Sequence, residues 1–455
     1  MALPVPDTSP SPDASDRDVI QSASPLRTLG LARIWRLIWD PAPGRMGYAL
    51  RMAAGCTTTV LVGEIWQVPD LGVPALVTMA LWQKDRVTNA LVGVLVNIVV
   101  VFLLLLIYGL IKITLDHAME LVIVIALLSF GFFFLGSASK LKPVAYMFGL
   151  IIVFGLVVID QVPVGEVITR AILYTDLFLA VPGAVMIVLG MLICPSPRRV
   201  LTDDIAARLL MACRLLRGAD DRTREQATDM LRIGTTDMMK SAKMAGLEKI
   251  WAAKDLACLR QAASSSVAVL ALADEANRNG LSAEDAARLI ETLEKMAAIF
   301  AAGDYPADIE RPTVSTASPA ACAMADMLPE FTTPPAESTK AAPPEKKSGF
   351  FADDAFSNPE HVRFAVKGTA GVMLSYLAFM VLDWPGIHTC IITCFIVALP
   401  TMGEMVSKLT LRISGALVGG TIGIGSIIFV MPHLDGITGF LVLIFVVSLL
   451  AAWVK

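Results

Sequence analysis

Long uncharged apolar runs restrict this chain to a fold that crosses a membrane. No Asp, Glu, Lys or Arg occurs in residues 87–111, 384–403 or 413–434. A helix needs about 20 apolar residues to cross the hydrocarbon core of a bilayer, and these runs are of that length. Only 17% of the 455 residues are charged, whereas soluble domains carry about 25%. The chain is therefore expected to be an all-α polytopic membrane protein.

The apolar runs fall into two blocks, which sets the domain organisation. Residues 46–197 hold six expected spans and residues 361–455 hold four. Between them we expect a helical bundle over 198–302 and, over 303–360, a Pro-rich segment that is either a linker or a loosely packed excursion. The expected spans are 46–66, 72–83, 87–111, 118–139, 143–159 and 167–194, then 362–382, 386–403, 405–430 and 436–453.

The first 45 residues differ from both blocks. Their start is rich in Ser, Pro and Asp, which is typical of a disordered tail. Residues 31–39 then follow the pattern of a short amphipathic helix. One face carries Leu31, Ile34, Trp35 and Ile38, with Arg33 and Arg36 beside it. This helix either lies among lipid headgroups or packs on the soluble part of the chain.

Basic residues in the connectors predict the orientation. Lys and Arg follow the even-numbered spans, whereas the opposite connectors are mostly acidic, with Lys112 as the exception. By the positive-inside rule, the N-terminus and the bundle are cytoplasmic. The basic connector residues are Lys84, Arg86, Lys140, Lys142, Arg198 and Arg199.

The bundle shows helical spacing without a strand signal. Further helices are expected over about 222–245, 247–278 and 284–302. Gly280 is placed to end one helix, and Ser282 with Asp285 begins the next like a capping box. The net charge of −4 gives no basic surface for nucleic acid.

The two blocks begin alike, which indicates an internal repeat. Arg51 and Arg363 each open a span, a Pro- and Gly-containing turn follows, and the third span carries Gly93 or Gly415. Because six spans lie between the copies, both have the same orientation. The blocks are therefore expected to be parallel repeats about an axis along the membrane normal.

The second block resembles the fusaric acid resistance (FUSC) family of bacterial inner-membrane exporters, which includes aromatic carboxylic acid efflux subunits. The resemblance is carried by Leu382-Asp-Trp-Pro-Gly-Ile387, by Pro400-Thr-Met-Gly403, and by Lys408, Arg412, Gly415 and Gly419 in K-x3-R-x2-G-x3-G spacing. The same pattern is similar to plant aluminium-activated malate channels. In the first block, Ala90 and Asn97 stand where Arg412 and Gly419 would align.

The resemblance implies a proton-coupled exporter of weak organic acids in the bacterial inner membrane. It also implies a periplasmic adaptor protein and an outer-membrane channel as partners, and a homodimer. That family has six spans in its second block, so we expect the four seen here to be either a truncation or a shortened member.

Two cations are the candidates for a carboxylate site. Arg412 and Lys408 lie on one helical face with Gly415 and Gly419, and bare backbone at the glycines would line the path or permit close helix packing. The alternative is that both cations mark a span end and extend to the headgroups.

Two acids are the candidates for proton coupling. Asp176 lies inside the sixth span, six residues before Pro182-Gly183, where a carboxylate is costly unless it is paired or faces water. Its alternative is a structural pair with Arg170 or a Thr. Glu64 lies near the outer end of the first span, where an interfacial role is the simpler interpretation.

The sequence shows none of the residue patterns that are typical of an enzyme active site. There is no P-loop, metal-ligand spacing or nucleophile–His–acid set, and the seven cysteines show no CxxC spacing. We therefore expect no enzyme activity, metal or cofactor. The leading hypothesis is a secondary exporter of aromatic organic acids; the alternatives are a passive organic-anion channel and a non-transporting membrane scaffold.

Overall fold

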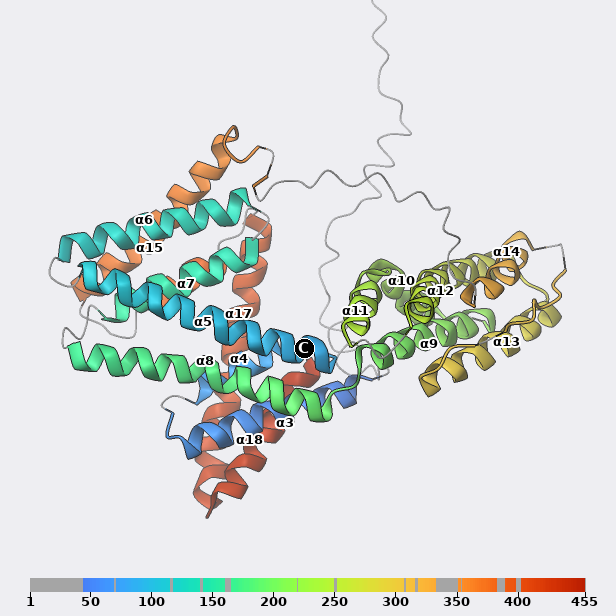
Figure 1. Ribbon diagram of the computed structural model, residues 1–455, viewed down its shortest axis with the longest axis horizontal. Coiled ribbons are helices and arrows are strands. Elements are labelled where there is room, and N and C mark those ends of the chain that lie inside the picture. Colours follow the sequence, from blue (N-terminus) through green and yellow to red (C-terminus); the bar gives the residue numbers. More distant parts are fainter. Residues whose placement is uncertain are drawn as a thin grey trace, which may run out of the picture.

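The part of the chain that the computed structural model describes is mostly helical (Figure 1). The described residues are 44–68, 71–114, 118–139, 142–159, 165–218, 220–248, 252–306, 308–315, 318–332, 351–352, 354–382, 389–397 and 402–454. The predicted tail, the helix over 31–39, and the Pro-containing turns at 69–70, 384–386 and 400–401 lie outside these residues. Among the described residues, the one extended pairing is an isolated bridge between Ser139 and Phe351.

The helices of the first block match the six expected spans closely. Among the described residues, seven helices are long and apolar enough to cross a membrane. Six of them belong to the two blocks, and the seventh, α12 (Ala253–Asn279), belongs to the bundle. The first-block helices are α3 (Arg45–Ile65), α4 (Gly72–Leu81), α5 (Arg86–Thr114), α6 (Ala118–Ala138), α7 (Lys142–Ile159) and α8 (Gly165–Ile193).

The second block contributes four described helices. The described part of its second helix, α16, has 9 residues, and α4, the second helix of the first block, has 10. A stretch of π-helix, Ser426–Val430, follows α17. The second-block helices are α15 (Pro359–Leu382), α16 (Thr389–Val397), α17 (Met402–Gly425) and α18 (Ile437–Val454).

The two blocks pack into each other instead of forming separate bundles. In the first block, α5 lies along α8 while α3 and α4 also pack on α8. The second block is divided between two places, because α15 and α16 pack on α6 and α7, whereas α18 packs on α3 (Figure 1). Phe395 of α16 stacks on Phe133 of α6 with ring centroids 4.6 Å apart, inside one apolar core.

The helical bundle, which we predicted to be cytoplasmic, lies to one side of the membrane helices (Figure 1). The chain passes from the first block into the bundle between α8 and α9. The single helix predicted over 222–245 is wrong, because the chain breaks at Gly234, whose φ of 61° favours glycine. Arg208 of α9 donates a hydrogen bond to the carbonyl of Gly234 at 3.1 Å and fixes the break. The bundle helices are α9 (Pro197–Leu216), α10 (Asp221–Ile233), α11 (Thr236–Leu247), α12 (Ala253–Asn279) and α13 (Ala283–Ala302).

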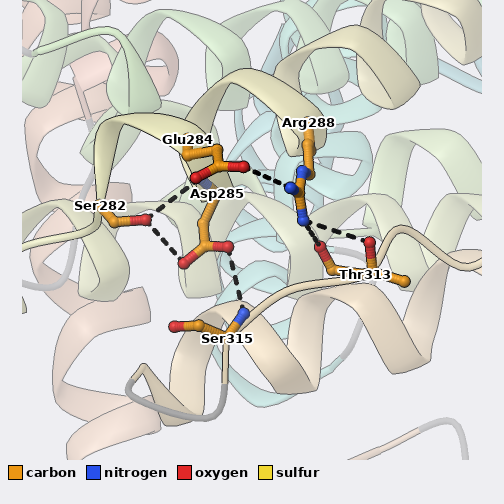
Figure 2. A network of polar contacts seen from close by, with 6 residues as sticks. All are labelled: Ser282, Glu284, Asp285, Arg288, Thr313 and Ser315. Carbon is orange, nitrogen blue, oxygen red and sulfur yellow. Dashed lines mark hydrogen bonds and ion pairs between the residues drawn. The ribbon is translucent and has the colours of Figure 1, made fainter.

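The start of α13 has the predicted cap. The amide of Asp285 donates to the Ser282 hydroxyl at 3.1 Å, and that hydroxyl donates to the Asp285 carboxylate at 2.7 Å. The same carboxylate accepts the amide of Ser315 at 3.1 Å, while Arg288 bonds Thr313 (Figure 2). These bonds lower the pKa of Asp285 below its usual range, the Ser282 hydroxyl most and the Ser315 amide next.

Residues beyond Ala302 also belong to the bundle. The cap network holds the segment around Ser315 against α13, and α14 (Pro319–Met327) and a 3-10 turn, Leu328–Phe331, then pack on α12. Met324, Leu328 and Phe331 are buried in the same core as α9 and α13. The Pro-rich segment therefore includes a part that completes the bundle.

Candidate functional site

The proposed anion residues lie on one stripe of α17. Lys408, Arg412, Gly415 and Gly419 recur at intervals of four and three residues, which places them along one side of a helix. Arg412 is half-buried and Lys408 exposed, and neither has an ion pair among the described residues. A Cβ atom on either glycine would meet nothing within 4 Å. The stripe is therefore open along its length.

Helix α17 stands largely alone among the described helices. It contacts α16 and runs into the π-helical stretch, and no residue from Gly403 to His433 is buried. The four residues of the predicted face therefore lie on one helix, and their role as an anion path stays a prediction. No described helix packs on that face, so the described helices supply only one side of a path along it.

The proposed proton-coupling acid lies elsewhere, on α8. Asp176 is half-buried, six residues before Pro182, which is inside the helix and cannot donate a backbone hydrogen bond. Arg170 is not its partner, because Arg170 pairs with Glu166 at 2.7 Å on an exposed surface. Within the described residues, Asp176 has no ion pair.

The described helices do not bring these candidates together. Asp176 belongs to the helix that packs on α5, α3 and α4, whereas α17 packs on α16. Glu64 is exposed near the C-terminal end of α3, as expected for an interfacial residue. The acid and the cations therefore belong to separate parts of the membrane region.

A close seam between α5 and α8 was not predicted as a feature. A Cβ atom on Gly93 would lie 2.6 Å from the carbonyl oxygen of Gly183, so only glycine fits there. Asn97 lies against Gly183 one turn further along, and Asn89 lies against Gly190. The four-residue spacing of Asn89, Gly93 and Asn97 is the sequence signal that could have revealed this interface.

A second unpredicted feature joins the basic α4–α5 connector to the bundle. Asp85 caps α5 by accepting the amide of Thr88 at 2.8 Å. Arg86 donates its amide to the carbonyl of Pro195 at 3.0 Å and pairs through its guanidinium with Glu248 at 2.8 Å. The basic turn thus lies against the same side of the membrane block as the bundle.

This chain is similar over one stretch to multidrug resistance protein MdtO. It is 40% identical to MdtO of Escherichia coli (strain K12) over 111 residues, which are 24% of this chain and 16% of that protein. MdtO of Shigella flexneri is 39% identical over a stretch of the same length and coverage. No family model matches the chain, and no solved structure matches it.

The matched stretch is a small part of MdtO. It covers 16% of that protein, so the similarity is to one segment of MdtO and not to the whole protein. It agrees with the many apolar helices of the structure in pointing to a membrane protein.

Proposed function

We propose that this protein is an inner-membrane efflux transporter that expels aromatic or other hydrophobic organic acids. The observation that carries the proposal is the similarity to a multidrug resistance protein, in a chain whose blocks consist of apolar, membrane-length helices. In this proposal the chain acts as a secondary transporter and not as an enzyme.

The substrate class rests on the stripe of α17. Arg412 is a permanent cation on an apolar helix, and it lacks an acidic partner among the described residues. A guanidinium in such a place can bind a carboxylate in bidentate geometry, and the exposed apolar side chains beside it suit an aromatic ring. This supports an organic anion as the substrate, with Gly415 and Gly419 leaving room beside the cation.

The energy source rests on Asp176. A carboxylate inside a membrane helix, half-buried and without an ion pair in the described part of the chain, can bind and release a proton. We place proton coupling there and give Glu64 an interfacial role. A passive anion channel would need the cation and not the acid.

The topology and partners belong to the same proposal. The N-terminus, the bundle and the basic connectors are placed in the cytoplasm, which the ion pair between Arg86 and Glu248 supports by joining a basic turn to the bundle. A periplasmic adaptor protein and an outer-membrane channel would carry the substrate onward, and the transporter itself would be a homodimer.

The test is the substrate profile of a cell that lacks the gene. Deletion should lower the tolerance to aromatic carboxylic acids such as fusaric acid and hydroxybenzoates, and expression of the protein should restore it. Dissipating the proton gradient should abolish export. Unchanged tolerance to every organic acid, together with sensitivity to cationic drugs, would overturn the assignment of an anionic substrate.

A further inference from the structure

Helix α11 of the bundle carries a basic stripe along one side. Four exposed side chains follow one another at intervals of four, three and four residues, which places them on one face of the helix. They are Thr236, Lys240, Lys243 and Leu247. In the described part of the chain, neither lysine has an ion pair. The stripe therefore presents two cations to its surroundings and ends in an apolar side chain.

The acidic groups near α11 have other partners. Asp237 lies off the stripe, and its charge acts on Arg208 of α9. Glu248 follows the last residue of the helix and pairs with Arg86 at 2.8 Å. Because these two carboxylates are directed to Arg208 and Arg86, the face that carries the lysines is positively charged.

The apolar end of the stripe borders a groove on the membrane block. Leu247 lines this groove, of about 580 Å³, together with Met191 of α8 and one side of α5 from Val87 to Ile98. All of its lining residues are apolar. Leu91 and Ile98 are 48% and 63% exposed, so the groove is open toward the surroundings of α5.

The groove has the depth of one leaflet of a bilayer. Eleven steps along α5 separate Val87 from Ile98, which is about 16 Å at 1.5 Å per residue. Half of a hydrocarbon core of about 30 Å is close to that length. Helix α11 lies on the side of the bundle that faces the membrane helices (Figure 1). The lysines thus lie where a lipid with its chain in the groove has its headgroup.

We propose that the basic stripe of α11 and the apolar groove of α5 together bind an anionic phospholipid from the leaflet on the side of the bundle. Lys240 and Lys243 contact the phosphate of the headgroup, and an acyl chain lies along α5 beside Leu247. Charge complementarity favours an anionic headgroup over a zwitterionic one, because basic side chains at a membrane surface attract anionic lipids. The apolar groove favours a lipid over a soluble phosphate, which has no chain to fill it.

The bound lipid connects the bundle to the first membrane block. Its headgroup lies on α11 and its chain on α5, next to the ion pair of Arg86 with Glu248. A ligand that binds only the folded protein raises its melting temperature. The site is independent of the transported substrate, since neither Arg412 nor Asp176 belongs to it.

Thermal unfolding of the purified chain in detergent at low ionic strength tests the headgroup. Phosphatidylglycerol should raise the melting temperature more than phosphatidylcholine with the same acyl chains. Lys240→Gln combined with Lys243→Gln should raise the phosphatidylglycerol concentration needed for half of that shift by about tenfold or more. Arg278→Gln combined with Lys295→Gln removes the same charge from α12 and α13 and should leave that concentration unchanged. Equal effects of the two double variants would overturn the proposal.

Photocrosslinking tests the groove. Phosphatidylglycerol that carries a diazirine in its acyl chain should label the α5 peptide containing residues 87–98 several-fold more than the corresponding phosphatidylcholine. Equal labelling by both lipids would mean unselective contact with the bilayer and would overturn the proposal. Labelling by neither lipid would mean that a polypeptide covers the groove, which would equally overturn it. Glycerol 3-phosphate should not raise the melting temperature, and stabilisation as large as that by the lipid would reassign the lysines to a soluble phosphate.

Discussion

Arg86 and Glu248 form an ion pair of 2.8 Å that joins the first membrane block to the bundle. The Glu248 side chain is 7% exposed and that of Arg86 is 33% exposed, so the pair is shielded from water mainly on the bundle side. Arg86 is also held by its amide bond to the carbonyl of Pro195. The pair therefore fixes where the end of α11 lies against the start of α5.

Replacing Glu248 should loosen this junction. We expect Glu248→Gln to cost about 1–2 kcal/mol of docking free energy, because the charge-assisted hydrogen bond is lost while Arg86 can still be hydrated. Hydrogen exchange of amides at the end of α11 should become faster. Glu166→Gln removes an ion pair with both side chains more than 70% exposed and should change stability by less than about 0.5 kcal/mol. Equal effects of the two variants would contradict the assigned role.

The α5–α8 seam predicts a steric effect that depends on position. Gly93→Leu would place a Cβ atom 2.6 Å from a backbone oxygen of α8, which cannot move aside as a side chain can. We expect a loss of about 1–3 kcal/mol, typical of overpacking, seen as a lower melting temperature in detergent. Gly109→Leu on the same helix has open space and is the matched control. A seam that tolerated Gly93→Leu as well as Gly109→Leu would not be a close interface.

The Asp285 network predicts a pH dependence in the bundle. Its pKa is lowered in the folded protein, first by the Ser282 hydroxyl and then by the Ser315 amide. A lowered pKa contributes stability above the unfolded value, about 3.9 for Asp, and that stability is lost as the pH falls through the folded value. The contribution should be complete at neutral pH.

The measurement compares wild type with Asp285→Ala by hydrogen exchange in peptides that contain Ser315. The variant should exchange faster at neutral pH, and the difference should shrink as the pH falls below about 3.9. Asp221→Ala, which alters an exposed side chain at the start of α10, is the control. A difference that stayed constant down to the lowest pH would contradict a role for the ionised carboxylate.

Local features of this fold could be predicted from the sequence, and contacts between distant segments could not. Uncharged runs set the helix bounds, and Ser282 with Asp285 marked the start of α13, because both depend on residues a few positions apart. The break at Gly234 was missed because it depends on a positive φ and on Arg208 from another helix. The packing of α3 on α18 joins opposite ends of the chain, and no local pattern encodes it.

The candidate site divides in the same way. The stripe of Lys408, Arg412, Gly415 and Gly419 was predictable from their intervals of four and three residues and lies on α17. The distance between that stripe and Asp176 depends on how the blocks pack, which spacing does not report. The pair of Asp176 with Arg170 was open as an alternative, and the structure pairs Arg170 with Glu166.

Proton coupling through Asp176 predicts a selective loss of function. Asp176→Asn keeps the size and polarity of the side chain and removes its titration, so efflux driven by a pH gradient should be lost while the protein stays in the membrane. Transport assays in vesicles with an imposed gradient provide the measurement. Glu166→Gln on the same helix is the control. Unchanged flux in Asp176→Asn would move the coupling to another group or favour a passive channel.

Anion binding at Arg412 predicts a graded loss across three variants. A charge-assisted hydrogen bond is worth about 1.5–3 kcal/mol, so Arg412→Ala should raise the KM for an organic acid by about tenfold or more. Arg412→Lys should recover part of the loss, because it keeps the charge and loses the bidentate geometry. Lys408→Ala should have a smaller effect, since Lys408 is exposed and lies one turn closer to the N-terminal end of α17. Full recovery by Arg412→Lys, with reduced membrane levels in Arg412→Ala, would instead mean that the cation anchors the helix to lipid headgroups.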